Sequence, residues 1–212
     1  MGVSTSARRR DPVQERSQET VGRVLAGAGR LLARGVPPNG LTTAQIATEA
    51  GLSVGALYRF FPDKQAVVDA IALRHLEAFQ EGVATRLMLA LPDSPAGLLG
   101  AVLDSFAAYL EANPDFRTLA YGPPGGGGRA ISSALFEAQS GAGELAGMVR
   151  EVLAEMYDLR TGGEDFAFRL RIAIEIGDRL LAHAFTQEGA ARVRVLDEAK
   201  AILSGYLLGA MA

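Results

Sequence analysis

Apolar side chains recur at steps of three and four residues along almost the whole chain, and this periodicity restricts the fold more than any other feature. Such spacing puts them on one face of an α-helix, whereas a strand needs alternation with a period of two, which is nearly absent here. The pattern predicts an all-α protein of about nine helices. The expected helical stretches are Val13–Arg34, Ala44–Ala50, Val54–Phe60, Lys64–Leu91, Ala96–Ala112 and Asp115–Tyr121, followed by stretches near 130–158, 164–187 and 190–210.

The composition excludes several classes of site. The chain has 212 residues, 49% of them apolar and 21% charged, which is ordinary globular usage and enough to bury a core. It has no cysteine, which excludes disulfides, iron–sulfur clusters, cysteine-based zinc sites and cysteine nucleophiles. His75 and His183 are far apart and show no metal-ligand spacing, so we expect neither a metal nor a cofactor. No apolar stretch approaches the ~20 residues of a membrane-spanning helix, so we expect no membrane partner. The first residues lack the apolar core of a secretory signal, so we expect a cytoplasmic location.

The net charge is divided unevenly along the chain. Residues 1–75 contain ten Lys and Arg against six Asp and Glu, a net charge of +4, whereas residues 76–212 contain eleven against eighteen, a net charge of −7. The whole-chain value of −3 hides this difference. A basic first third is typical of a chain that meets a polyanion at one end. Chance variation in small counts produces the same asymmetry, so charge alone does not decide.

The segment from residue 41 to 64 predicts a helix-turn-helix. Two short helical stretches are joined by a three-residue turn that begins with Gly51, at a position that suits a left-handed backbone. In this motif the first helix braces the second, and the second can lie in a major groove of DNA. Val54, Leu57 and Phe60 are expected to face the core, and Gly55, Tyr58 and Arg59 to project outward. The expected N-caps are Thr42 or Thr43, Ser53 and Asp63.

This segment resembles the DNA-binding domain of TetR-family (tetracycline-repressor-like) transcriptional regulators. The spacing Leu-Tyr-x-x-Phe-x-x-Lys is more specific than a generic helix-turn-helix requires. Asp63 stands where many members have serine, and both residues cap helices. At motif level the resemblance covers roughly residues 13–75. The matching positions are Thr43, Ile46-Ala47, Ala50-Gly51, Ser53, Gly55, Leu57-Tyr58, Phe60, Phe61 and Lys64.

The resemblance implies a set of DNA-binding residues. Phosphate contacts would come from Thr43, Tyr58 and Lys64, and base-edge contacts from the second helix, with Arg59 best suited to a bidentate guanine contact. The alternative for each residue alone is structural: Thr42 and Ser53 only cap, Tyr58 only packs, and Arg59 is only solvated. The expected set is Thr42, Thr43, Gln45, Ser53, Val54, Gly55, Tyr58, Arg59 and Lys64.

The chain is accordingly expected to divide into a helix-turn-helix domain at 1–75 and an effector-binding and dimerisation domain at 76–212. Within the first, residues 1–12 would form a flexible basic arm. Arg8-Arg9-Arg10 would either add phosphate or minor-groove contacts, as basic arms do, or form a nonspecific tail. The long helix that begins at Lys64 joins both regions and is the natural lever between them.

The last two helical stretches are apolar on more than one face, which predicts burial inside a core or against another chain. In the family these helices pair with their twins, so a two-fold homodimer on a palindromic operator is expected. The expected interface residues are Ile172, Ile176, Leu180, Val195, Ile202 and Tyr206. The family also implies a small apolar effector among the middle helices. The residues expected to line its pocket are Phe79, Val83, Leu87, Leu103, Phe106, Tyr109, Phe116, Tyr121, Phe136 and Met148.

Other patterns do not indicate catalysis. Four glycines at 125–128 lack the preceding strand and the following Lys-Ser/Thr of a phosphate loop, so a flexible connector is expected. Glu175 and Asp178 lie one turn apart near two arginines, which favours ion pairing over acid–base chemistry. The leading hypothesis is a ligand-responsive repressor that is not an enzyme. The rival hypotheses are a helical enzyme or ligand carrier with an incidental helix-turn-helix, and a helical adaptor protein.

Overall fold

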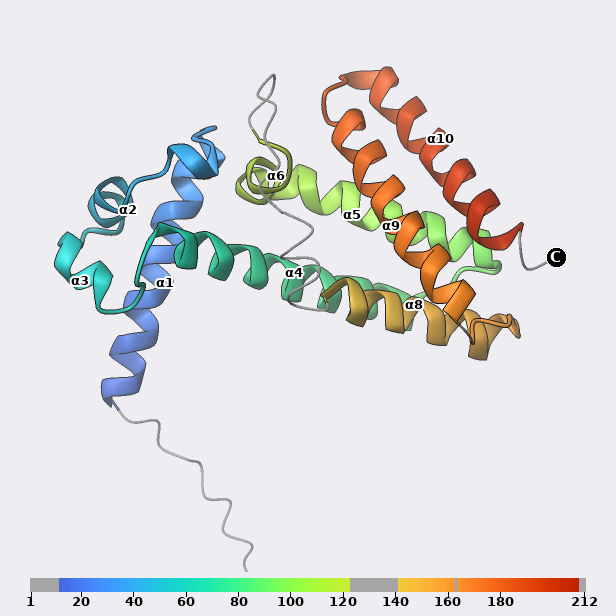
Figure 1. Cartoon of the computed structure of the whole chain (residues 1–212), viewed down its shortest axis with the longest axis horizontal. Helices are drawn as coiled ribbons and strands as arrows, with labels where there is room; N and C mark the ends of the chain where they lie inside the picture. Colours follow the sequence, from blue (N-terminus) through green and yellow to red (C-terminus); the bar gives the residue numbers. More distant parts are fainter. Residues whose placement is uncertain (1–11, 123–140, 163, 210–212) are drawn as a thin grey trace, which may run out of the picture.

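The computed structural model describes residues 12–122, 141–162 and 164–209, and Figure 1 shows the arrangement of its helices. Within these ranges the structure contains helices and no strand, which confirms the all-α prediction. The elements are α1 (Pro12–Ala33), the 3-10 turn η1 (Pro38–Gly40), α2 (Thr43–Ala50), α3 (Val54–Tyr58), α4 (Lys64–Leu89), α5 (Pro95–Ala112), α6 (Pro114–Tyr121), α8 (Gly141–Tyr157), α9 (Glu164–Ala184) and α10 (Gly189–Leu208).

Side-chain caps define where the short helices begin. Thr42 caps α2, and the Ser53 and Asp63 side chains accept hydrogen bonds from the third residues of α3 and α4. Gly51 ends α2 with φ of +66°, the left-handed conformation expected from its position. The helix α3 is shorter than predicted and ends at Tyr58, because the chain continues as a turn toward Pro62.

The molecule has two packed parts joined by α4. The N-terminal head comprises α1, α2, α3 and the first half of α4, and the bundle comprises the second half of α4 with α5, α8, α9 and α10. In Figure 1, α4 runs from the head into the bundle, and α9 and α10 lie side by side at the far end. Among the described residues, none of the helices combines the length and apolar character needed to cross a membrane.

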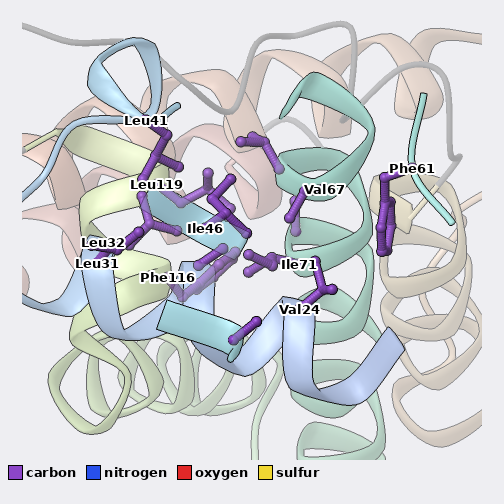
Figure 2. Packing of buried hydrophobic residues seen from close by; sticks show 14 of the residues in the cluster. Val24, Leu31, Leu32, Leu41, Ile46, Phe61, Val67, Ile71, Phe116 and Leu119 are labelled. Atoms are coloured by element: carbon purple, nitrogen blue, oxygen red, sulfur yellow. The ribbon is translucent and has the colours of Figure 1, made fainter. Parts of the chain in front are cut away.

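The core of the head extends beyond the first 75 residues. Ile46 and Ile71 pack with Phe116 and Leu119 of α6, and all four side chains are buried (Figure 2). A second core lies in the bundle and contains Phe79. The helix α6 therefore bridges the predicted regions, and the division at residue 75 stays a prediction.

Candidate nucleic-acid interface

An arginine of α1 holds the turn of the helix-turn-helix. One guanidinium nitrogen of Arg23 donates to the carbonyl oxygens of Ala50 and Gly51, each at 2.8 Å. These carbonyls are at the C-terminal end of α2, where the helix leaves acceptors unpaired and where positive charge is favourable. The α1 backbone approaches closely here, since a Cβ on Gly27 would lie 3.0 Å from the Ala50 nitrogen. The turn between α2 and α3 is thus fixed against α1.

Arg30 of α1 and Arg34, which directly follows α1, hold the last turn of α2 through Glu49. Arg30 donates to the Glu49 carboxylate at 2.9 Å and to its backbone carbonyl at 2.6 Å, and Arg34 donates to the other carboxylate oxygen at 2.7 Å. Hydrogen bonds from Arg34 and Arg30 lower the pKa of the Glu49 carboxyl. The sequence analysis did not single out these arginines, although Arg30 lies seven residues after Arg23 on the same face of α1 and Arg34 follows Arg30 by four residues.

The first turn of α2 is closed by a capping box. The Thr42 hydroxyl accepts a hydrogen bond from the Gln45 N–H, and the Gln45 side-chain oxygen accepts from the Thr42 backbone N–H at 3.0 Å. Both side chains are exposed, so capping and DNA contact are compatible. The Thr43 hydroxyl lies 3.4 Å from the Tyr58 hydroxyl, which joins the first turn of α2 to the end of α3.

The helix α3 has one buried side and one open side. Leu57 is fully buried in the head and Tyr58 is 51% exposed, as predicted. The prediction that Val54 faces the core is wrong: its side chain is 38% exposed, because it lies in the first turn of α3, on the open side of the helix. Ser53 and Gly55 are exposed, and a Cβ on Gly55 would meet nothing within 4 Å. A major groove can therefore approach the α3 backbone closely at this point.

Arg59 and Lys64 have different environments. Arg59 is exposed at the end of α3, with its guanidinium 5.8 Å from the centre of the Phe60 ring. Lys64 instead donates to the carbonyl oxygens of Asn39 at 2.7 Å and Leu41 at 3.0 Å, which ties the start of α4 to the loop before α2. Two of the three ammonium donors are used in this way. A phosphate contact of Lys64 would use the third ammonium hydrogen, and it stays a prediction.

An apolar cavity with a volume of about 150 Å³ lies in the bundle. Phe79, Leu103 and Phe106 of the predicted pocket set line it, together with Leu99, Val149 and Leu170. The polar side chains on its wall are Gln80 and Asp178. Its apolar lining suits a ligand with little polar surface.

The remaining predicted pocket residues lie elsewhere. Val83, Leu87 and Met148 pack in the bundle core without lining this cavity, and Phe116 is fully buried in the head. Tyr109 lines a separate cleft between α1 and the start of α6. The Tyr121 hydroxyl donates to the Asp178 carboxylate at 3.0 Å, and burial together with that carboxylate raises the Tyr121 pKa well above its ordinary value. Phe136 lies outside the described residues.

The helices predicted to dimerise pack against one another and keep an open apolar face. On α9, Leu170 and Leu181 are buried, whereas Phe168 is 57% exposed. On α10, Ile202 is 45% exposed. The other predicted interface residues are half-buried: Ile172, Ile176, Leu180, Val195 and Tyr206.

In the part of the chain that the structure describes, no three His, Asp or Glu side chains are arranged so that they could hold a metal ion.

Comparison with known families decides the assignment. A family model described as "Bacterial regulatory proteins, tetR family" matches residues 24–71, which include α2 and α3. A second, described as "Tetracyclin repressor-like, C-terminal domain", matches residues 93–211, more than half of the chain. The chain belongs to the TetR family. Both matches support a DNA-binding transcriptional regulator, as the residues at 41–64 predict.

Individual known proteins match different fractions of the chain. A TetR-family transcriptional regulator from Streptomyces coelicolor is 27% identical, with a TM-score of 0.66, over 91% of this chain and 99% of that one. FadR from Bacillus subtilis, solved with stearoyl-CoA, shares the fold at 12% identity, with a TM-score of 0.66, over 86% of this chain and 96% of its own. The nucleoid occlusion factor SlmA of Colwellia psychrerythraea is 30% identical over 86 residues, 40% of this chain and 41% of that protein. The chain thus matches about two fifths of the length of this curated relative.

Proposed function

We propose that the chain is a ligand-responsive repressor that binds a palindromic operator as a homodimer. The observation that carries this proposal is the two-sided α3, with Leu57 buried behind it and Gly55 open in front. A short helix braced in this way can enter a major groove without losing its packing. A regulator of this kind acts where the chromosome is, which places it in the cytoplasm, and it needs no catalytic step.

The DNA contacts follow from the open face. The neighbouring hydroxyls of Thr43 and Tyr58 suit one phosphate, because they lie 3.4 Å apart and both project from the head. Arg59 suits a guanine edge, a bidentate contact worth about 1–3 kcal/mol of discrimination. Ser53, Val54 and Gly55 approach the bases at the start of α3. Thr42, Gln45 and Lys64 complete the proposed set of DNA contacts, at the edge of the interface.

One short helix contacts too few base pairs for tight specificity, and two copies of the chain together contact twice as many. The exposed apolar face of α9 and α10, which includes Ile202, would join the copies along a two-fold axis. The two α3 helices would then read half-sites about 34 Å apart, or a multiple of that spacing.

The bundle cavity is the proposed effector site. An apolar effector that contacts Phe79 and Phe106 would act on α4 and α5 at once. To release DNA, the effector must bind the DNA-free arrangement of the protein more tightly than the DNA-bound one. A difference of about 1–3 kcal/mol in binding free energy is typical of such coupling. Because α4 extends from Phe79 at the cavity wall back into the head, it is the proposed lever.

Retention of genomic DNA fragments in a gel shift tests the DNA-binding proposal. The wild-type chain should retain a small subset of fragments. Arg59→Ala should reduce the preference among them. Tyr58→Phe should weaken the binding of all fragments and leave the salt slope unchanged, because it removes a neutral hydrogen-bonding group and no charge. Arg160→Ala, at an exposed position after α8, is the matched control. Retention that is insensitive to both head variants would indicate nonspecific charge binding and contradict the proposal.

Light scattering tests the proposed dimer. The wild-type chain should show twice the mass of one chain at micromolar concentration, and Ile202→Glu should shift it toward the monomer because it places a charge in the apolar interface. Met88→Glu is the control, since Met88 is an exposed apolar side chain at the end of α4, outside α9 and α10. A wild-type monomer throughout that range would overturn the dimer assignment.

A further inference from the structure

Five ring side chains connect the bundle cavity to the core of the head. Phe79 on the cavity wall contacts Phe106 and Tyr109 of α5, with ring centres 4.7 and 5.6 Å apart. Tyr109 contacts Phe116 of α6 at 5.7 Å, and Phe116 stacks on the His75 ring at 4.9 Å. His75 lies one helical turn before Phe79 on α4. One aromatic cluster thus joins three helices at the boundary of the two cores.

His75 is the one ring of this cluster whose residue type can bind a proton and become a cation. Its Nδ1 lies 2.9 Å from the Tyr109 hydroxyl and its Nε2 lies 3.1 Å from the Asp115 carboxylate. Burial acts to raise the pKa of the Asp115 carboxyl, but hydrogen bonding and charge from His75 and two backbone hydrogen bonds lower it overall. An ionised carboxylate only accepts, so Nε2 carries hydrogen and Nδ1 accepts from Tyr109 in the neutral ring.

The same carboxylate touches the helix that holds the DNA-binding turn. A Cβ on Gly29 of α1 would lie 3.0 Å from the Asp115 Oδ2 atom, so α1 and α6 meet at this oxygen. The arginines of α1 in turn hold the end of α2. His75 therefore contacts the Asp115 carboxylate at the point where α4, α6 and α1 meet, and α1 is the helix that holds the helix-turn-helix in place.

Solvent reaches this joint through a cleft of about 580 Å³. The His75 side chain is 14% exposed there, which allows proton exchange. The titratable or charged groups that face it are Arg30 from α1, Arg74 from α4, Tyr109 from α5 and Asp115 from the start of α6. Asp115 is the acidic group in direct hydrogen-bond contact with the ring, so a proton gained by His75 forms an ion pair at the joint.

We propose that His75 is a positioning residue that links operator binding to protonation by locking α6 and α1 against α4. This inference rests on the proposed function, because it concerns the affinity for operator DNA. The protonated ring donates from both nitrogens and pairs with Asp115, which stiffens the joint. A head that is already rigid loses less conformational entropy when it binds DNA. The added positive charge also favours binding to the DNA polyanion. Operator affinity should therefore rise as the pH falls.

The experiment measures duplex affinity at about pH 6 and about pH 8, the range in which a histidine titrates. The probe is a duplex recovered by the wild-type chain from a random-sequence library. The wild-type affinity should be about fivefold or more higher at the lower pH. Asp115→Asn keeps the acceptor and removes the charge, so it should bind as the wild type does at high pH and lose most of the increase. His75→Gln should lose the increase as well.

His183→Gln is the matched control, because His183 is the only other histidine of the sequence and is exposed at the end of α9. It should keep the wild-type pH profile. If the wild-type affinity is flat or falls on acidification, or if Asp115→Asn and His75→Gln keep the wild-type increase, His75 is not the linked group and the inference is overturned while the proposed function stands. If no duplex is recovered at either pH, the proposed function and this inference fall together.

Discussion

Two glycines four residues apart serve the helix-turn-helix for different reasons. Gly51 adopts φ of +66°, and a Cβ there would lie 3.1 Å from the Arg23 guanidinium. Gly51→Ala should therefore lower the free energy of unfolding by about 1–2 kcal/mol, measured by urea denaturation. Gly22→Ala is the control, because Gly22 lies inside α1 with nothing within 4 Å, and it should raise stability by up to ~1 kcal/mol. Equal effects of the two variants would contradict this explanation of Gly51.

Gly55 is required by the proposed partner and not by the fold. It lies in α3 with open space at its Cβ position, so Gly55→Ala should raise the free energy of unfolding by about 0.5–1 kcal/mol. The added methyl group points toward the proposed groove, so duplex affinity should fall in the gel shift. A stabilised variant with unchanged DNA affinity would place Gly55 outside the interface.

Among the helices, α2 is held against α1 by ion pairs of Glu49, and the stability that these ion pairs provide depends on pH. Because the Glu49 pKa is lowered in the folded chain, its pairing with Arg34 and Arg30 stabilises the head above the unfolded value of about 4.3 and is lost as the pH falls through the folded value. Glu49→Gln should lower stability at neutral pH, and the difference from the wild type should shrink on acidification. Urea midpoints across the acid range measure this.

The size of that difference should also fall in high salt, because Glu49 and its partners face solvent. The same substitution at Glu151, an exposed residue of α8, is the control and should leave the pH profile unchanged. A Glu49→Gln profile parallel to the wild type down to low pH would show that the pair does not stabilise the head.

At the scale of the whole molecule, the head depends on a side chain from beyond the predicted boundary. Phe116 of α6 is fully buried in the head core, so Phe116→Ala should lower the free energy of unfolding by about 3–5 kcal/mol. Phe168→Ala, at a position 57% exposed, should have a much smaller effect. Hydrogen exchange would show whether the α1 and α2 amides lose protection with those of α6. Unchanged protection in the head would indicate that residues 1–75 are stable without α6.

Local chemistry made part of this structure predictable. The caps at Ser53 and Asp63 and the left-handed Gly51 depend on neighbours within a few residues, and helical spacing depends only on the side chains of one segment. The buried Leu57 and the exposed Tyr58 follow from the same periodicity. For these reasons the sequence predicts the helix-turn-helix and most of its open face, with Val54 as the exception.

The helices, their caps and the motif that identifies the family are therefore predictable from local sequence. The packing of the helices decides that Phe79 faces the cavity while Phe116 completes the head, because both are aromatic residues at helical spacing and their surroundings come from other helices. It also decides that Lys64 binds backbone carbonyls and that His75 meets a carboxylate forty residues away. Contacts between distant segments depend on how helices pack, and no local pattern encodes that packing.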